Sequence, residues 1–498
     1  MRCLTDATAT RHARPPRRAR RAALCLAAWL GVGAPGHGQA SPSPLPDFGD
    51  PSATVLTPQA ERQIGEALLA RLRQQGVLLE DLQVVDYVES LGARLAMRSS
   101  LGPASTTFFV VRDGSINAFA APGGMIGIHT GLILASDSES ELAAVIAHEI
   151  AHISQRHMAR TFEAAGRMQL PMAVGILAAL LLGQVDAEVG QAALAGTLAG
   201  SQQQQIDFIR TNEEEADRIG IQVLADAGFD PLGMPRFFAK LQRNQRLYGD
   251  ALPEFLRTHP VNVSRIASAE ERAGSLPPPR LPDPTDYRLT RLRVEVLTTD
   301  NAEALAGRLE QRRNAGDREA GYGLALLQIK RGRGGDALQT LAPLLEQDGD
   351  RPEYLAARAE ALAGSGALEQ ATEVYRSALA IYPGQRALTL GYAQLLLNRG
   401  QAATVQQLLQ AELAAGRATR AVHLLLAEAS AKQGRRLEAH LQRAEWLLLD
   451  GRTEEAADEL RRALAEAPDA NDYLAAKVAA RLAEIEAKLL AQAPRPPQ

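Results

Sequence analysis

The chain has 498 residues, too many for one hydrophobic core, so its length predicts two or more domains. Hydrophobic residues make up 46% and charged residues 22%, a composition that is typical of folded proteins and excludes a wholly disordered chain. The net charge at pH 7 is −4. Aromatic residues reach only 4%, whereas alanine and leucine are abundant, so the composition favours helices over sheets.

The first 40 residues differ from the rest of the chain. An arginine-rich segment precedes the apolar run "AALCLAAWLGVGA", and the small residues Gly38 and Ala40 suit a cleavage site. This pattern predicts a secretory signal peptide over residues 1–40, followed by a flexible segment rich in Pro and Ser over 41–54. The alternative is a membrane anchor, but the apolar run is shorter than the ~20 residues that span a bilayer. We therefore expect export.

The predicted signal peptide holds seven of the 54 basic residues and one of the 58 acidic residues, which leaves 47 and 57 and a net charge of −10. A negative charge of this size argues against nucleic acid or anionic lipid as a main partner. Both cysteines, Cys3 and Cys25, lie in the same segment. The exported chain therefore cannot form a disulfide, and core burial must stabilise it, with at most a metal to help.

Residues 55–274 combine helical patterns with one short β section. The stretch "TTFFVVRDGSINAFAAPGGMIGIHTGLI" has β-branched and aromatic runs separated by Asp113-Gly114 and Gly123-Gly124, which are turn signals. It predicts two or three antiparallel strands. The strand around Asn117–Gly123 is a candidate edge for binding an extended peptide, and the alternative is an internal strand.

A second apolar run, "PMAVGILAALLLGQ", covers residues 171–184. It is also shorter than the ~20 residues that span a bilayer. We expect a buried helix, with a peripheral contact to a membrane surface as the alternative.

A helix that carries two histidines begins near Ser138. Ser138 and Glu141 form an S-x-x-E capping box, and the apolar residues after it follow helical spacing. On this helix His148 and His152 lie one turn apart on one side, with Glu149 next to them. In this H-E-x-x-H pattern two neutral imidazoles bind Zn²⁺ and the carboxylate takes a proton from the metal-bound water. The alternative is a pair of surface histidines on an amphipathic helix.

A catalytic zinc site needs a third protein ligand and one open position. The segment "RTNEEEADRIGIQVLADAGFDP" predicts a second helix that ends at Gly228, with Pro231 just beyond it. Its Glu213 and Asp217 are four apart and share a face, so one carboxylate is a candidate ligand and the other a candidate partner of a ligand imidazole. The alternative is a solvated acidic face.

The last part of the chain repeats. Five prolines in residues 276–284 predict a stiff linker within 275–300. After it, glycines recur with a step of 34 residues, each preceded seven residues earlier by an alanine: Gly332, Gly366, Gly400 and Gly434. This phase predicts tetratricopeptide repeats over 301–490, in which the glycine ends the first helix of each pair, and a disordered tail over 491–498. The alternative is a generic helical bundle.

Together these motifs resemble the M48 family of metallopeptidases, in particular exported members with tetratricopeptide tails. The resemblance rests on HEIAH, on E-x-x-x-D within "NEEEADRIG", and on the flanking "INAFAAPGGMIGIHTGLI", "HISQRH" and "FLRTHPVNVSRI". It covers roughly residues 50–490 and is strongest from Asn117 to Ile266. It implies a mainly α fold with a small β-sheet, in which a zincin-like metalloprotease domain is followed by an α-solenoid of tetratricopeptide repeats.

The resemblance also implies roles for single residues at one Zn²⁺ ion per chain. The zinc ligands would be His148, His152 and Glu213. Glu149 would be the general base. Asp217 would contact one of the zinc-binding residues without contacting the zinc ion itself.

Three further residues are candidates for other roles. His259 of "THP" matches a histidine that, in one member of the family, can occupy the open metal position and hold the enzyme inactive. His157 and Arg265 are candidates for stabilising the developing oxyanion, and a buried structural role is the alternative for His157. That same family member has a disulfide between its repeats and its catalytic domain, which this chain cannot make.

The function that the resemblance implies is that of a zinc-dependent endopeptidase of the periplasm. It would act in the assembly and quality control of outer-membrane β-barrel proteins, with unfolded or stalled outer-membrane proteins as substrates and with chaperone activity. Its repeats would bind the outer-membrane assembly machinery. The alternative is a non-catalytic tetratricopeptide scaffold or chaperone whose metal domain is regulatory, although a scaffold has no need of Glu149.

Overall fold

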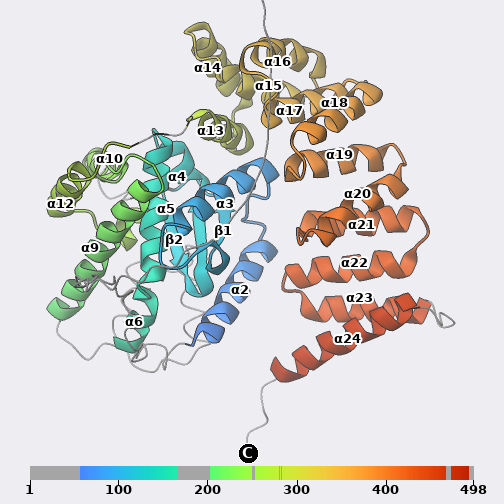
Figure 1. Ribbon diagram of the computed structural model, residues 1–498, viewed down its shortest axis with the longest axis horizontal. Helices are drawn as coiled ribbons and strands as arrows, with labels where there is room; N and C mark the ends of the chain where they lie inside the picture. The colour runs from blue at the N-terminus through green and yellow to red at the C-terminus, as the bar shows by residue number, and fades with distance from the viewer. Residues whose placement is uncertain are drawn as a thin grey trace, which may run out of the picture. The chain divides into compact units, whose positions relative to one another are not determined.

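The computed structural model describes residues 57–164, 202–248, 253–279, 281, 283–466 and 473–492 (Figure 1). The predicted signal peptide, the segment 41–54, the apolar run 171–184 and residues 493–498 of the predicted tail lie outside these residues. Within them the chain is mainly helical with one small sheet, which confirms the predicted fold class. None of the described helices combines the length and apolarity needed to cross a membrane.

The N-terminal part, up to residue 274, is a three-stranded sheet with helices around it. The strands are β1 (Thr107–Val111), β2 (Ala118–Ala121) and β3 (Met125–His129). The α-helices are α2 (Pro58–Gln74), α3 (Leu82–Ala96), α4 (Thr130–Ala135), α5 (Glu139–Ser154), α6 (His157–Ala164), α9 (Gln202–Asp226), α10 (Gly233–Tyr248), α11 (Glu254–Thr258) and α12 (Val263–Gly274).

In the sheet, β3 lies between β1 and β2. The strands β2 and β3 are antiparallel and are joined by a tight turn in which Gly123 and Gly124 have φ of 75° and 77°, a conformation that glycine adopts readily. By contrast β1 runs parallel to β3, with Phe108 opposite Ile126, so the prediction of antiparallel pairing is wrong for these two strands. The physical reason is that residues 112–117 carry the chain past β3 to the opposite edge of the sheet.

Helices cover both faces of the sheet. Successive side chains of a strand point to opposite faces, and accordingly Phe108 and Val110 pack in the core that contains α3 and α5, whereas Phe109 and Val111 pack against α2. All residues of β3 are buried. Helix α5 contacts both β2 and β3, and this contact holds its histidines beside the sheet.

Helix α13 (Thr285–Thr298) occupies the second half of the range predicted as a linker. Its Tyr287 and Val294 belong to the core of the N-terminal part. Its Leu289, Leu292 and Val296 belong to the core of the first repeat helices. The helix therefore joins two cores by burying two apolar faces.

The C-terminal part consists of helices that pack on their neighbours in chain order, drawn from olive to red in Figure 1. They are α14 (Ala302–Asn314), α15 (Ala320–Lys330), α16 (Gly334–Asp348), α17 (Pro352–Gly364), α18 (Leu368–Ile381), α19 (Arg386–Asn398), α20 (Ala402–Ala414), α21 (Arg420–Lys432), α22 (Arg436–Leu449), α23 (Thr453–Glu466) and α24 (Tyr473–Gln492). The four glycines of the 34-residue phase follow α15, α17, α19 and α21, with φ between 72° and 80°. This left-handed conformation ends each first helix, as predicted.

Charged side chains of α13 and α19 pair with carboxylates at the N-cap and in the first half of α3. Arg293 of α13 donates hydrogen bonds to both oxygens of Asp81, at 2.7 and 2.8 Å. Arg386 of α19 forms ion pairs with Asp86 and Glu89. Ion pairs therefore connect the two parts without a disulfide.

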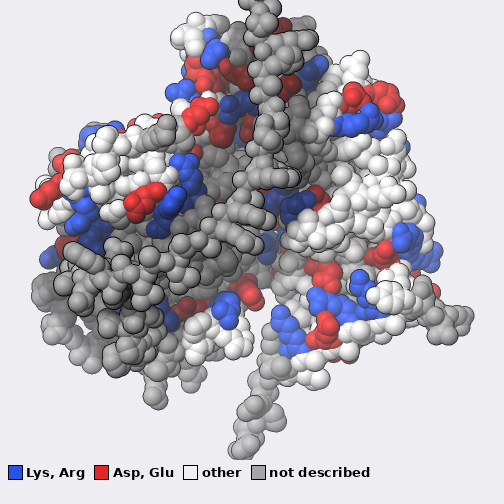
Figure 2. Space-filling model, viewed as in Figure 1, with Lys and Arg blue, Asp and Glu red and all other residues white. Residues whose placement is uncertain are grey.

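The face in Figure 2 carries basic and acidic side chains side by side over the described helices. Ion pairs with at least one exposed partner, such as Arg318–Asp348 and Arg461–Glu486, also occur on the described helices. A nucleic-acid-binding protein typically presents a continuous basic stripe instead. The mixture is typical of a solvated surface.

Replacement of Arg293 by alanine should lower the free energy of unfolding by roughly 2–4 kcal/mol, because it leaves the largely buried carboxylate of Asp81 without its partner. Arg288→Ala, on the same helix, is the matched control. The Arg288 side chain is 58% exposed in its pair with Glu319, and such surface pairs contribute about 0–1 kcal/mol. Denaturant unfolding measures both variants, and equal losses would contradict the importance of Arg293.

Candidate metal centre

Helix α5 carries the H-E-x-x-H motif and is buried along most of its length. Its start confirms half of the predicted capping box, because Ser138 Oγ accepts a hydrogen bond from the N–H of Glu141 at 3.3 Å. The carboxylate of Glu141 instead accepts from the N–H of Asp137 at 2.9 Å and from Lys240 of α10 at 2.7 Å. Both the local cap and α10 therefore define where the helix begins.

Helix α9 packs closely along α5. A Cβ atom at Gly220 would lie 3.2 Å from the backbone N and Cα of His148, so a larger residue would push the helices apart. Gly228, with φ of 82°, lies two residues after Asp226, the last residue of α9, and confirms the predicted end of this helix. This close packing brings Glu213 and Asp217 within reach of α5.

Four side chains from three separate segments converge at one point: His148 and His152 of α5, Glu213 of α9, and His259 after α11. One possible ligand atom from each lies within 4.8 Å of the others. The Nε2 atoms of the two α5 histidines are 3.0 Å apart, and the oxygens of Glu213 lie 3.5 and 3.4 Å from them. With ligands about 2.0–2.1 Å from a tetrahedral zinc ion, neighbouring ligand atoms are roughly 3.3–3.4 Å apart. The spacing of these atoms therefore fits a zinc ion.

The charges of the buried groups also fit a cation. Glu149, Glu213 and Asp217 are all buried, and among the buried residues described around them only Arg265 has a permanently positive side chain. Buried carboxylates are unstable unless cations or hydrogen bonds balance them. A divalent ion at the point where the imidazoles meet would supply the missing positive charge.

The two α5 histidines differ in their pKa. Burial lowers the pKa of His152 to about 3, which keeps this imidazole neutral, as a metal ligand must be. Burial acts in the same direction on His148, but hydrogen bonds to Asp217 and Glu213 outweigh it and raise its pKa to about 10. A metal ion bound at His148 would therefore displace a proton.

Asp217 and Arg265 do not reach the point of convergence themselves. They contact His148 and Glu213, whose side chains meet there. Asp217 Oδ1 is 3.0 Å from His148 Nδ1, the position expected of a partner of a ligand imidazole. The Arg265 guanidinium donates to both oxygens of Asp217 and pairs with Glu213 at 2.9 Å. This placement differs from the expected role of Arg265 at the oxyanion, because its charge is already bound to two carboxylates.

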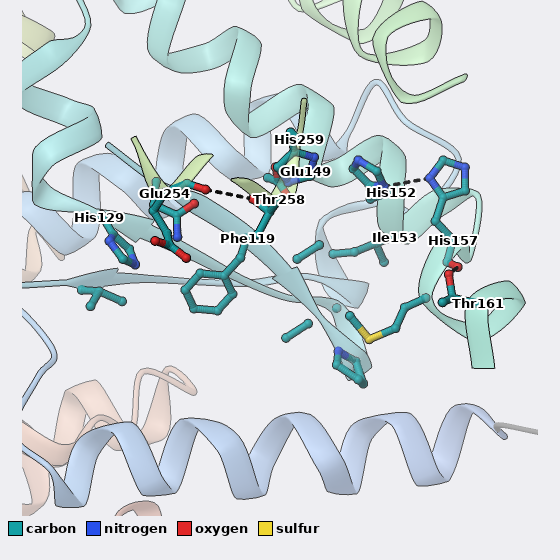
Figure 3. Close-up of a pocket in the computed structure, with 18 of the residues that line it drawn as sticks. Phe119, His129, Glu149, His152, Ile153, His157, Thr161, Glu254, Thr258 and His259 are labelled. Atoms are coloured by element: carbon teal, nitrogen blue, oxygen red, sulfur yellow. Dashed lines mark hydrogen bonds and ion pairs between the residues drawn. The ribbon is translucent and has the colours of Figure 1, made fainter. Parts of the chain in front are cut away.

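Glu149 points to the same place from α5 (Figure 3). Burial raises the pKa of its carboxyl, although an N–H of Ala120 in β2 donates to it. Its Oε1 has no hydrogen-bond partner among the described residues. A buried carboxylate with a raised pKa and an oxygen that accepts no hydrogen bond is suited to accept a proton.

His259 follows the short helix α11 and reaches the same point. Its Nδ1 is 2.9 Å from Glu213 Oε1 and 3.3 Å from His148 Nε2, and its Nε2 is 3.5 Å from Glu149. Its ring stacks on Phe255, with ring centroids 4.8 Å apart. A single histidine in a loop has no spacing signal, so only the family resemblance indicated this residue.

His157 was the other oxyanion candidate. Its Nδ1 lies 2.8 Å from His152 Nδ1, and its Nε2 lies 3.1 Å from Glu215 Oε2. Figure 3 shows it on the far side of the His152 ring from Glu149 and His259. Both ring nitrogens are therefore engaged away from the point of convergence.

A cavity of about 560 Å³ opens beside these residues. Its other end is lined by His129, whose Nδ1 is 2.8 Å from Ser115 Oγ, and by Asn117. Reasoning from the sequence missed His129 and Ser115 because they lie 14 residues apart in no recognisable spacing. The sheet brings them together, since β3 ends at His129 beside the loop that contains Ser115.

Comparison with known proteins agrees with this geometry. Residues 83–273 match Peptidase family M48. The β-barrel assembly-enhancing protease of Escherichia coli K12 is 34% identical over 444 residues, which cover 87% of this chain and 90% of that protein. A putative β-barrel assembly-enhancing protease of Vibrio cholerae is 35% identical over 392 residues, which cover 78% and 80%.

A more distant similarity covers a smaller part of the chain. The mitochondrial metalloendopeptidase OMA1 of Arabidopsis thaliana is 35% identical over 170 residues, 34% of this chain and 32% of that protein. The similarity to the two bacterial proteases, by contrast, extends over most of both chains. Given this extent and a cluster of histidines and carboxylates that fits zinc, the chain belongs to peptidase family M48 and is a zinc metalloendopeptidase.

Proposed function

We propose that this metalloendopeptidase works in the periplasm, where it cuts unfolded or stalled outer-membrane β-barrel proteins and assists the assembly of others. The names of the two bacterial relatives support the link to β-barrel assembly, and the predicted signal peptide supports export. The observation that carries the catalytic part is the approach of Glu213 to His148 and His152, beside the buried carboxylate of Glu149.

In this proposal His148, His152 and Glu213 hold the metal. A zinc ion bound there would supply Lewis-acid chemistry, activating a water and polarising the scissile carbonyl. The carboxylate of Glu149 would accept a proton from the attacking water and donate it to the leaving amine. Asp217, which Arg265 holds in place, keeps His148 Nδ1 engaged, so that Nε2 of the same ring is directed at the metal.

We also propose that His259 occupies the fourth position and holds the enzyme inactive until the loop moves. The short distances from its Nδ1 to Glu213 and His148 support this role. With His259 in that place, a substrate carbonyl has no access to the metal. Displacement of His259 would create the open position that a catalytic zinc needs.

The repeat helices are proposed to bind the outer-membrane assembly machinery and to provide chaperone activity. Stacked helical pairs form extended surfaces of the kind that bind proteins. The rival function is a scaffold without catalysis, in which the metal site only stabilises the chain. Glu149 separates the two, because it is needed for proton transfer and not for holding a metal.

Glu149→Gln should retain zinc and lower the cleavage of an unfolded test protein by about 10²–10⁴-fold, because an amide cannot accept the proton of the water. Zinc content and cleavage rate of the purified chain measure the two effects. Glu271→Gln, an exposed change of the same type in α12, is the control. Undiminished cleavage by Glu149→Gln would favour a different base. Absence of cleavage with zinc bound, in the unsubstituted chain and also in His259→Ala, would favour the scaffold.

His259→Ala should raise basal cleavage severalfold at unchanged zinc content, because it removes the group that occupies the fourth position. His440→Ala in the repeats is the matched control, since His440 bonds to Glu459 at 3.0 Å, remote from the metal centre. Initial cleavage rates with saturating zinc test the change. A rate equal to or below that of the unsubstituted chain would mean that His259 does not block the site.

A further inference from the structure

The Nδ1 atoms of the two α5 histidines, which face away from the point of convergence, have different partners. Nδ1 of His148 meets a carboxylate directly, at 3.0 Å from Asp217 Oδ1. Nδ1 of His152 meets a second imidazole, at 2.8 Å from His157 Nδ1. The ring of His157 then leads to a carboxylate, with Nε2 3.1 Å from Glu215 Oε2.

We propose that His157 is a positioning residue that fixes the tautomer and the orientation of His152 for metal binding. The inference rests on the proposed role of His152 as a zinc ligand. It assigns His157 to a chain of hydrogen bonds, His152–His157–Glu215, that does for the second ligand what Asp217 does for the first.

The proton positions follow from the contacts. Two ring nitrogens at 2.8 Å form a hydrogen bond only when one carries a proton and the other does not. A carboxylate can only accept, so His157 Nε2 donates to Glu215, and in the neutral imidazole the other nitrogen, Nδ1, is the acceptor. His152 Nδ1 must then be the donor, and its Nε2, 3.4 Å from Glu213, keeps the lone pair that a metal ion needs.

The backbone is arranged to make this contact. Residues five apart on a continuous helix point in different directions. Arg156, between α5 and α6, has φ of 52°, a conformation that residues other than glycine rarely adopt, and it breaks the helix. The break turns His157 back toward His152, with the ring centroids 4.8 Å apart.

The far end of the chain of hydrogen bonds is also held. Glu215 of α9 accepts a hydrogen bond from Arg160 of α6 at 2.7 Å, which orients its carboxylate. His157 itself is 4% exposed, so water competes little for its two bonds. The partners of metal-binding imidazoles commonly contribute 10–100-fold to metal affinity.

The test compares two replacements of His157 in the chain without its predicted signal peptide, using zinc alone as the probe. His157→Phe keeps a ring but removes the acceptor, and it should weaken zinc binding about 10–100-fold in competition with a chelating indicator. His157→Asn offers an oxygen at the place of Nδ1 and should retain affinity within a few-fold. The absorption spectrum of the Co²⁺-substituted chain should change in the Phe variant and not in the Asn variant.

Three outcomes would overturn the inference. The Phe variant could bind zinc as tightly as the unsubstituted chain, or both variants could lose zinc affinity equally. Alternatively, both metal-free variants could lose thermal stability equally with no change in zinc affinity. Should the Phe variant fail to fold, Glu215→Ala takes its place, with an expected loss of about tenfold. His152→Ala separates the two levels of the argument. If His152→Ala binds zinc normally, the proposed ligand set is wrong. If His152→Ala loses zinc binding while His157→Phe binds zinc normally, only the role of His157 is overturned.

Discussion

The metal centre depends on the close packing of α9 against α5. Gly220 lets the two helices approach until their backbones are almost in contact at His148. At this separation the carboxylate of Glu213 reaches the Nε2 atoms of both α5 histidines. A wider separation would take the two buried carboxylates of Glu213 and Asp217 away from their imidazole partners, and burial of unpaired charge is strongly unfavourable.

Helix α9 serves the centre with three acidic residues at alternate positions. Glu213 meets the point of convergence, Asp217 meets the outer nitrogen of His148, and Glu215 reaches His157 of α6. Each of these carboxylates is bound by an arginine or an imidazole, so each negative charge of the helix has its own partner. An imidazole whose outer nitrogen is held rotates less, and it loses less entropy when it binds a metal.

The repeat helices are tied to this domain by a largely buried ion pair of Arg293, by more exposed ion pairs of Arg386 and by apolar contacts. Arg293 binds the carboxylate at the N-cap of α3, Arg386 binds carboxylates in its first half, and α13 adds apolar contacts to both cores. Partly exposed ion pairs weaken as the salt concentration rises, whereas buried apolar contacts do not. The connection therefore combines a part that responds to ionic strength with a part that does not.

The sequence by itself determined the local features: the H-E-x-x-H pattern on a helix, the acidic pair of α9, the glycines that end helices and the 34-residue phase of the repeats. These follow from short-range rules, because helical spacing places residues four apart on one face and a left-handed glycine ends a helix wherever it stands. Only the tertiary structure decided which strands pair in parallel, where Arg265 and His157 point, and that Glu215, Ser115 and His129 lie near the site. Those contacts join segments between 14 and about 60 residues apart, and no local rule specifies them, because they arise from the packing of whole elements.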